Sequence, residues 1–413
     1  MILKTIDEYN KNGKRTIAIF CDAYYPAVDG VIKVLENHAT YLAKNNNIIL
    51  CVPKHKNKLY DESKNKYLVI GINALSVSSV GYDLALPSAD KNFKNIINKA
   101  RIDIVHLHSP FSLGAFAVNF AKKKKIPVIG TFHSLYKQDF YKATNNKALA
   151  VMLTNIIMNV FNKCNLVLTM NPYAEKMLRE YGYKGKIKLL PNSIGWTIHS
   201  DVDNEKEMFI KKYNIQKNQV VFSFIGRLVI QKQILFMADV IKRLKEKGID
   251  SKLILIGDGV DASKLKKKIK EDGTEDNFIF TGILKDERTK SALLGISKLF
   301  MFPSTYDTDG IVKIEAACMK VPTICVENTG VASSITDNVN GYISELDVEI
   351  FTNRIIEILK NEELRKQVGE NAYKDLYLTW DEIVTKLEEY YTEEIANMTI
   401  KRLKNARKYK NKK

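Results

Sequence analysis

The sequence predicts an α/β protein with two parallel sheets, and two observations support this fold class. Short apolar runs alternate with stretches of helix-forming composition along almost the whole chain, which is the pattern of βαβ units. A polar stretch at 195–215 divides the runs into two series. The runs lie at 16–20, 48–52, 102–107, 128–131, 166–170 and 187–190, and then at 220–224, 253–256, 278–281, 299–302 and 323–326. We therefore expect domains at 1–195 and 196–375, followed by a last helix and a basic tail at 376–413.

Charge is distributed unevenly along the 413 residues. Residues 1–195 contain 28 Lys and Arg against 13 Asp and Glu, whereas residues 196–400 contain 28 against 34. Residues 401–413 add eight basic residues and no acid, which we expect to form a disordered tail. A one-sided basic face favours a polyanionic partner, either an anionic membrane surface or nucleic acid. Lysine-rich composition alone would not produce this asymmetry.

The cysteines and the apolar runs bear on where the protein works. The five cysteines have no paired spacing, which is typical of small buried side chains in a reducing compartment. No signal peptide opens the chain, and no run reaches the ~20 apolar residues of a spanning helix. The nearest candidate, 151–170, is interrupted by Asn155, Asn159, Asn162 and Lys163. We expect a cytoplasmic protein, peripheral on the inner face of the cell membrane.

One helical stretch of the first half is the candidate for contact with lipid. Its apolar residues fall on one stripe and follow a lead-in of aromatic residues and lysines at 136–142. Such a stripe belongs to a protein core more often than to a membrane surface, so both interpretations stay open. The stripe consists of Leu149, Met152, Leu153, Ile156, Ile157, Val160 and Phe161.

Histidines stand at the ends of two predicted strands in the first half. Alternation along the strand places His106 and His108 on the same side, so metal binding is conceivable. No third ligand with suitable spacing follows, and we expect packing and hydrogen-bonding roles near the site instead. His133 closes the next strand. The first loop, at 22–31, ends with Gly30 before a helix, which is where a doubly wound sheet binds ligands.

The second half carries three loops with distinctive residues after its strands. The first contains Gly226 and Arg227, with Lys232 five positions after the arginine. The next two strands are followed by turns that contain Gly257 with Gly259, and Gly282 with Ile283.

The stretch 300–318 combines a strand, a polar loop and a helix. Pro303 closes the apolar run, the loop carries Asp307 and ends at Gly310, and Glu315 lies one turn into the helix. The unpaired N–H groups of a first helical turn suit a phosphate. These residues therefore predict a phosphate site bracketed by two carboxylates.

The words Phe302-Pro303-Ser304, Gly310-Ile311-Val312 and Glu315-Ala316, with two acids eight positions apart, resemble the signature of retaining glycosyltransferases of family 4. The glycine–arginine–leucine word at 226–228 and the proline–asparagine word at 191–192 resemble the same family. The resemblance covers roughly 16–395. It implies two facing Rossmann-like domains of the GT-B fold, with an active site in the cleft between them.

The resemblance also implies roles for individual residues. Arg227 and Lys232 would stabilise the leaving diphosphate, and Glu315 would accept hydrogen bonds from the ribose of the nucleotide. Asp307 and His133 would contact the donor sugar, so that the catalytic set is His133, Arg227, Lys232 and Asp307. The backbone at Gly30, Gly310, Ile311 and Val312 would hold the sugar diphosphate, and Gly257, Gly259, Gly282 and Ile283 would lie near the nucleobase.

This sequence departs from the family pattern at three positions. Asp307 stands where a glutamate is usual, Asp29 replaces one glycine of a pair, and Gln231 replaces an acid before Lys232. The first change shortens an arm that would contact the sugar by one methylene. Asp307 and Asp309 also look like a metal-binding aspartate pair, but we expect no metal ion and no cofactor besides the UDP-sugar donor.

A finer likeness, at 132–134, 180–185 and 306–312, is to bacterial enzymes that glucosylate 1,2-diacylglycerol. It implies transfer of a hexose, glucose in particular, from a UDP-sugar to a lipid acceptor at an anionic membrane. A polyprenyl-linked or polysaccharide acceptor is the enzymatic alternative. A nucleotide-sugar epimerase and a nucleic-acid-binding protein are the alternatives from other classes, but no interleaved aromatic and basic motif for nucleic acid is present.

Overall fold

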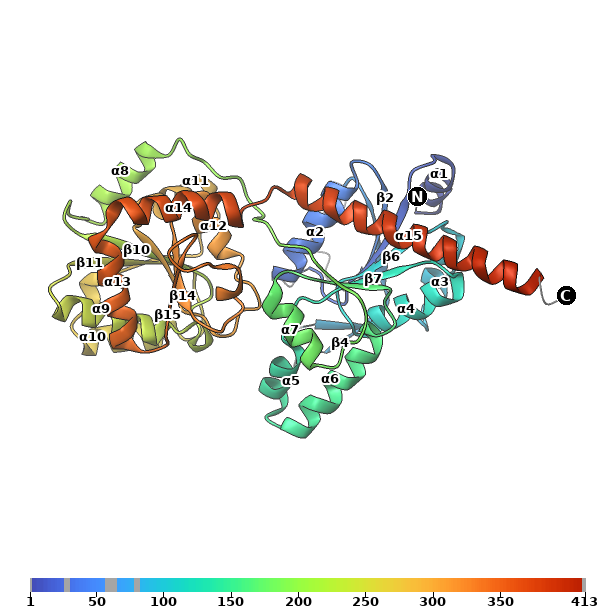
Figure 1. The fold of residues 1–413 in the computed structure, drawn as a ribbon, viewed down its shortest axis with the longest axis horizontal. Coiled ribbons are helices and arrows are strands. Elements are labelled where there is room, and N and C mark those ends of the chain that lie inside the picture. The colour runs from blue at the N-terminus through green and yellow to red at the C-terminus, as the bar shows by residue number, and fades with distance from the viewer. Residues whose placement is uncertain (1, 26–29, 56–64, 78–81, 411–413) are drawn as a thin grey trace. The chain divides into compact units, whose positions relative to one another are not determined.

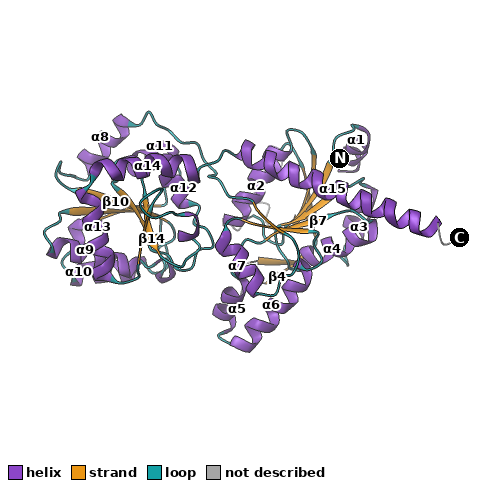
Figure 2. Cartoon of the chain, in the orientation of Figure 1, coloured by secondary structure: helices purple, strands orange, loops and turns teal. Residues whose placement is uncertain are grey.

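The computed structural model describes residues 2–25, 30–55, 65–77 and 82–410. The chain forms two compact units (Figure 1). The first unit contains the residues up to Asn192 together with the segment from Leu378 onward, and the second unit is Ser193–Tyr377. Helices flank the strands in both units (Figure 2). The C-terminal segment therefore belongs with the first half of the chain.

The first unit is built on a parallel sheet with the strand order β3-β2-β1-β6-β7-β8-β9. β1 lies between β2 and β6, so the order reverses there and the sheet is doubly wound. A short antiparallel pair, β4 and β5, is separate from this sheet. The strands are β1 (Thr16–Phe20), β2 (Asn47–Pro53), β3 (Leu68–Ile72), β4 (Ala74–Val77), β5 (Tyr82–Ala85), β6 (Ile104–Leu107), β7 (Val128–Thr131), β8 (Leu166–Thr169) and β9 (Ile187–Leu189).

The helices of the first unit connect these strands and cover the sheet. They are α1 (Ile2–Lys11), α2 (Gly30–Leu42), α3 (Lys91–Lys99), α4 (Ser112–Lys124), α5 (Tyr136–Thr144), α6 (Lys147–Phe161), α7 (Pro172–Glu180) and α15 (Trp380–Lys410). Several begin where the sequence offers a cap: the Asn171 side chain accepts a hydrogen bond from the Ala174 N–H, and Pro172 occupies the first helical position.

The long C-terminal helix α15 packs on α2 of the first unit. It begins at a capping box, in which the Thr379 N–H donates to Glu382 and the Glu382 N–H donates to the Thr379 hydroxyl. One side of the helix is buried in the unit through Trp380, Ile383, Leu387 and Tyr391. This spacing of three or four residues is the stripe that a packed helix requires.

The expectation of a disordered tail was wrong over 401–410, because α15 continues to Lys410. Lys, Arg, Ala and Leu all favour helix and no Gly or Pro interrupts the segment. Arg402 also donates hydrogen bonds to the carbonyl groups of Lys124 and Lys125, at the C-terminal end of α4.

The second unit repeats the plan of the first, with a parallel sheet in the order β12-β11-β10-β13-β14-β15. Its strands are β10 (Val220–Ile225), β11 (Ser251–Ile256), β12 (Phe278–Gly282), β13 (Leu299–Phe302), β14 (Thr323–Val326) and β15 (Tyr342–Ser344). Its helices are α8 (Asp203–Lys212), η2 (Ile230–Lys232), α9 (Ile234–Glu246), α10 (Ala262–Glu271), η3 (Glu275–Asn277), α11 (Glu287–Gly295), α12 (Val312–Cys318), η4 (Ala332–Ser334), α13 (Val348–Lys360) and α14 (Glu362–Leu376).

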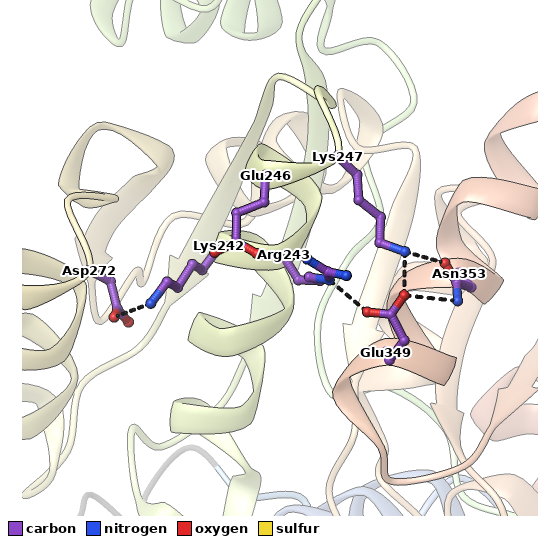
Figure 3. A network of polar contacts seen from close by, with 7 residues as sticks. All are labelled: Lys242, Arg243, Glu246, Lys247, Asp272, Glu349 and Asn353. Carbon is purple, nitrogen blue, oxygen red and sulfur yellow. Dashed lines mark hydrogen bonds and ion pairs between the residues drawn. The ribbon is translucent and has the colours of Figure 1, made fainter.

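A polar network ties α9 to α13 on the surface of the second unit (Figure 3). The Arg243 Nε donates to Glu349 at 2.6 Å, and the Lys247 Nζ donates to Asn353 at 2.8 Å and also pairs with Glu349. These hydrogen bonds lower the pKa of Glu349 to about 2. Exposed pairs contribute little stability; these join the C-terminal end of α9 to α13, whereas the start of α9 follows the loop of Lys232.

No helix among the described residues is long and apolar enough to cross a membrane.

Candidate active site

The candidate site of the second unit lies where its strand order reverses, between β10 and β13. All strands of this sheet are parallel, so the loops after β12, β11, β10 and β13 emerge at the same edge in that order. Ligands of open α/β sheets bind at such an edge, outside the carboxyl ends of the strands. The residues that the sequence singled out in the second half follow these four strands.

The loops after β10 and β11 touch through their backbones. A side chain at Gly257 would place its first carbon 2.1 Å from the carbonyl oxygen of Gly226, and one at Gly259 would meet the Leu228 backbone at 2.4 Å. The Gly257 N–H in turn donates to the carbonyl of Gly282, at the end of β12, at 2.9 Å. Because only glycine fits, these loops form one continuous rim. Ile283 extends from this rim and is 76% exposed.

The loop after β10 places its two cations differently. The Arg227 side chain is exposed and has no ion-pair partner among the described residues. Lys232 ends the short helix η2, and its side chain is only 14% exposed. The Lys232 ammonium lies 5.3 Å from the centre of the Phe302 ring, at the end of β13. It therefore reaches from the β10 loop to the β13 loop.

Lys232 and Asp307 form an ion pair across the two loops. The Lys232 Nζ donates to both carboxylate oxygens of Asp307, whose side chain is 20% exposed. Lys232 and Asp307 are thus in direct contact although they are 75 positions apart. The sequence analysis placed both residues in one site on the basis of two different motifs.

Asp309, two positions further, is also engaged by a lysine. The buried Lys313 ammonium donates to the Asp309 carboxylate at 2.9 Å, to the Asp309 carbonyl at 2.7 Å and to the Val331 carbonyl at 3.1 Å. All three of its protons therefore have acceptors. Lys313 was not assigned a role from the sequence: Asp309 is a local partner, but the Val331 carbonyl, 18 positions away, meets this lysine only in the fold.

Gly310 makes the turn into α12. Its φ of +74° is in the left-handed region, and a side chain there would collide with the Phe302 ring at 2.6 Å. The first hydrogen bond of this helical turn runs from the Lys313 N–H to the Gly310 carbonyl, at 3.0 Å. The N–H groups of Ile311 and Val312 come just before it in the chain. These amide groups open the helix at the rim of the site.

Glu315 lies on α12 beside Trp196, a residue of the segment that enters the second unit. Burial raises the pKa of the Glu315 carboxyl, and Trp196 and Lys290 lower it in part. The Lys290 ammonium in turn lies 4.2 Å from the centre of the Trp196 ring. A desolvated carboxylate of this kind is a ready acceptor for hydroxyl groups.

The remaining candidates, Gly30 and His133, belong to the first unit. Gly30 starts α2 in open space, and residues 26–29 of its loop lie outside the described residues. Asp22, at the start of that loop, was missed by the sequence analysis. It is buried and accepts hydrogen bonds from the Ser109 and Ser112 hydroxyls and from the Leu113 N–H, so it caps α4 from the neighbouring loop. Burial raises the pKa of Asp22, and these donors lower it in part.

His133 is part of a cluster of four buried histidines. Its Nε2 lies 3.0 Å from the Nδ1 of His108, and a ring nitrogen of His38, on α2, completes a group with His106 and His108 within 4.8 Å. The spacing in the sequence offered no third histidine, and the fold supplies one. Both nitrogens of His106 already have hydroxyl partners, at 2.6 Å from Tyr391 and 2.7 Å from Thr131. His106 is therefore engaged by hydroxyl groups through both nitrogens, whereas His38 Nδ1 and His108 Nε2 have no hydrogen-bond partner among the described residues.

The raised pKa of Glu315 leads to a prediction on stability. A carboxyl whose pKa is higher in the folded state favours folding below its unfolded pKa, and this advantage is lost as the pH rises through the folded pKa. Replacement of Glu315 by Gln should therefore raise the melting temperature relative to the native chain, by an amount that grows from pH 5 to pH 8. The control is Glu327→Gln, which removes an exposed acid after β14. A Glu315→Gln difference that stays flat or shrinks with pH would contradict the desolvation of this carboxyl.

Comparison with known proteins identifies the family. A family model described as "Glycosyltransferase Family 4" matches residues 28–195, and one described as "Glycosyl transferases group 1" matches residues 205–375. The chain is similar to the alpha-monoglucosyldiacylglycerol synthase of Acholeplasma laidlawii, at 24% identity over 86% of this chain and 91% of that protein.

It is also similar to the UDP-Gal:alpha-D-GlcNAc-diphosphoundecaprenol alpha-1,3-galactosyltransferase of Escherichia coli, at 25% identity over 81% of this chain and 85% of that protein. The structure of Anabaena Alr3699/HepE in complex with UDP aligns with a TM-score of 0.73 at 14% identity, covering 92% of this chain and 100% of that one. The chain thus belongs to glycosyltransferase family 4 and has the two Rossmann-like domains of the GT-B fold.

Proposed function

We propose that the chain transfers glucose, with retention of configuration, from UDP-glucose to 1,2-diacylglycerol at an anionic membrane surface. The observation that carries the proposal is the contact between Lys232 and Asp307 at the carboxyl edge of the second sheet. A cation and an acid in contact at such an edge support the binding of a nucleotide-sugar diphosphate and its hexose. The similarity to the Acholeplasma laidlawii synthase favours glucose and diacylglycerol among the possible sugars and acceptors.

The second unit offers a separate group for each part of the donor. Glu315, partly desolvated beside Trp196, would accept hydrogen bonds from the ribose hydroxyls. The rim formed by Gly257, Gly259 and Gly282 would present backbone groups to the uracil. Asp307 would exchange its lysine partner for a sugar hydroxyl when the donor binds.

Arg227 and Lys232 would act on the leaving diphosphate. Negative charge grows on the bridging phosphate oxygen as its bond to the anomeric carbon breaks, and cations already in place stabilise that charge without reorganisation. Lys232 is held by Asp307 and by the Phe302 ring, whereas Arg227 has no ion-pair partner among the described residues. The site therefore contains one restrained cation and one that can follow the diphosphate.

The same pairings argue that transfer needs no divalent ion. An aspartate pair binds a metal through free carboxylate oxygens, but Asp307 is paired with Lys232 and Asp309 with the buried Lys313. A divalent ion at this loop would have to displace two ammonium groups, one of which is only 2% exposed.

The acceptor would be reached from a face of the first unit made by α5 and α6, which lie side by side (Figure 1). The expected stripe divides between two faces: Ile157, Val160 and Phe161 are buried in the core, whereas Met152 and Ile156 are 52% and 55% exposed. Val151 and Tyr141 are each 42% exposed beside them. Exposed lysines flank this apolar surface at Lys137, Lys142 and Lys147. Exposed apolar side chains, with exposed lysines on the same two helices, suit the boundary of an anionic bilayer.

A second basic surface would add long-range attraction. The end of α4 exposes four lysines, Lys122 to Lys125. Arg402 of the C-terminal helix donates hydrogen bonds there to the carbonyl groups of Lys124 and Lys125. Each lysine near an anionic surface contributes about 1 kcal/mol. The tail and the four lysines would thus act as one surface.

An alternative acceptor is a polyprenyl-linked glycan, which the similarity to the Escherichia coli galactosyltransferase favours. The test is product analysis with radiolabelled UDP-glucose, UDP-galactose and UDP-N-acetylglucosamine, each offered diacylglycerol vesicles or a polyprenyl diphosphate-linked sugar. We expect label from UDP-glucose to appear in a monoglucosyl lipid whose α-linkage is seen by NMR. Transfer only to the polyprenyl-linked acceptor would establish the alternative, and conversion of the donor without any acceptor would indicate an epimerase.

Removal of either cation should slow the chemical step. Arg227→Ala and Lys232→Ala should each lower kcat by about 10²-fold, as for other preorganised groups that stabilise developing charge. Lys211→Ala, which removes an exposed lysine of α8, is the matched control and should leave kcat unchanged. A rise in KM with kcat intact would mean that these residues contribute only to binding.

Chelation should leave the reaction intact. Initial rates with EDTA should equal those without it, and added Mg²⁺ or Mn²⁺ should not raise them, because both aspartates of the loop have lysine partners. Loss of transfer in EDTA with recovery on adding either ion would overturn metal independence.

Membrane binding should have two separable components, one sensitive to salt and one not. The measurement is co-sedimentation with vesicles of anionic lipid between 0.05 and 0.5 M NaCl. This range spans 0.1 M salt, at which the Debye length is ~10 Å. Changing Lys122–Lys125 to glutamine should weaken the salt-sensitive part, and Met152→Ser with Ile156→Ser should remove the part that survives high salt.

Met208→Ser is the control for the apolar pair, because Met208 is 70% exposed on α8 of the second unit. A chain ending at Ala396 tests the tail separately. If removing the tail abolished binding while the glutamine variant and the serine variant bound normally, the first-unit docking surface would be wrong.

A further inference from the structure

The histidine cluster contains one direct contact between imidazoles. His108 and His133 lie 3.0 Å apart through Nδ1 and Nε2, with their rings stacked at 5.1 Å between centres. His108 is fully buried and His133 keeps 8% of its surface exposed. The other nitrogen of His133, Nδ1, has no hydrogen-bond partner in the part of the chain that the structure describes. Of the two ring nitrogens of His133, Nδ1 is thus the one that remains for a ligand.

Both imidazoles are neutral at physiological pH. Burial lowers the pKa of His133 to about 4 and that of His108 well below the usual range of histidine, where neighbouring histidines lower it further. A neutral imidazole carries one N–H and one lone pair, so the contact joins one donor with one acceptor. Two arrangements of protons are possible, and they present opposite groups at Nδ1 of His133.

The second nitrogen of His108 distinguishes the two arrangements. Its Nε2 is buried and has no hydrogen-bond partner among the described atoms. If His108 accepted a proton from His133, this Nε2 would be an unpaired, buried N–H group. If His108 donates from Nδ1, Nε2 carries only a lone pair. Buried N–H groups without an acceptor are rarer in proteins than acceptors without a donor, so the second arrangement is favoured.

We propose that His108 is a positioning residue, which donates its Nδ1–H to His133 and so fixes His133 as the tautomer with a proton on Nδ1. His133 then offers a hydrogen-bond donor, and not an acceptor, to an oxygen atom of the bound substrate. This inference rests on the proposed function in so far as that oxygen belongs to the sugar of the donor. The tautomer itself depends only on the contacts within the first unit.

His106 holds the network in place from behind. It packs against His108 at 4.3 Å between ring centres, and its two nitrogens bind the hydroxyls of Tyr391 on α15 and of Thr131 at the end of β7. Because Thr131 lies two positions before His133, the C-terminal helix and the His133 loop share one hydrogen-bonded support. The His108 ring therefore has little freedom to turn and exchange its donor for an acceptor.

The first test is the tautomer, measured on the full chain with ¹⁵N-labelled histidine at pH 7 in the absence of substrate. Long-range ¹H–¹⁵N spectra should show a protonated Nδ1 and an unprotonated Nε2 for His133. A protonated Nε2 would overturn the proposal. This outcome does not depend on whether the chain is a glucosyltransferase.

The second test separates positioning from a general loss of packing. His108→Leu removes the donor, whereas His108→Asn keeps a side-chain N–H close to the position of Nδ1. We expect kcat to fall about tenfold in the Leu variant, as for the loss of one hydrogen bond, and to recover largely in the Asn variant. Val105→Ala is the control, because Val105 is fully buried on β6, the strand that ends just before His108.

An equal loss of kcat in His108→Leu and Val105→Ala, or no recovery with Asn, would overturn the positioning role. If no donor and acceptor pair supports transfer in the native chain, the proposed function fails, and the spectra still decide the tautomer.

Discussion

The contact between two loop backbones at the carboxyl edge of the second sheet is the constraint on which the candidate site depends. Gly257 lies so close to the Gly226 carbonyl that no side chain fits, and the Gly257 N–H is bonded to the end of β12. The loop after β10 is thereby held against its neighbours. Because Arg227 and Lys232 belong to that loop, this contact restrains the start of the backbone that carries both cations.

Charge at this edge is balanced in pairs. Lys232 neutralises Asp307 and Lys313 neutralises Asp309, and the second pair is buried while the first is partly open to solvent. A buried pair that also satisfies all its hydrogen bonds fixes the loop. The more exposed pair can exchange partners at lower cost, since water can replace what each group loses. The candidate site thus combines a loop fixed by a buried pair with a second pair that is more open to exchange.

The sequence named most of the residues that follow the strands at this edge, because each belongs to a short local motif, and their roles stay a prediction. Arg227, Lys232, Asp307 and Glu315 each stand in a short word at the end of a strand, and the strands themselves are continuous apolar runs. What could not be predicted depends on distant partners. Tyr391 reaches His106 across 285 positions, and Asp22 caps a helix 90 positions away. His38, which lies on α2, joins His106 and His108 from a different part of the chain. The helical tail was missed because its support, the end of α4, is equally remote.

The central claim is that Lys232 and Arg227 hold the second phosphate of the nucleotide. The most direct measurement is the ratio of the dissociation constants of UMP and UDP, by calorimetry, in the native chain and in Lys232→Ala and Arg227→Ala. The account predicts that each substitution lowers this ratio about tenfold or more, since each removes a charged hydrogen bond to that phosphate. Glu315→Gln, by contrast, should weaken UMP and UDP alike. An unchanged ratio in both cation variants would contradict the account.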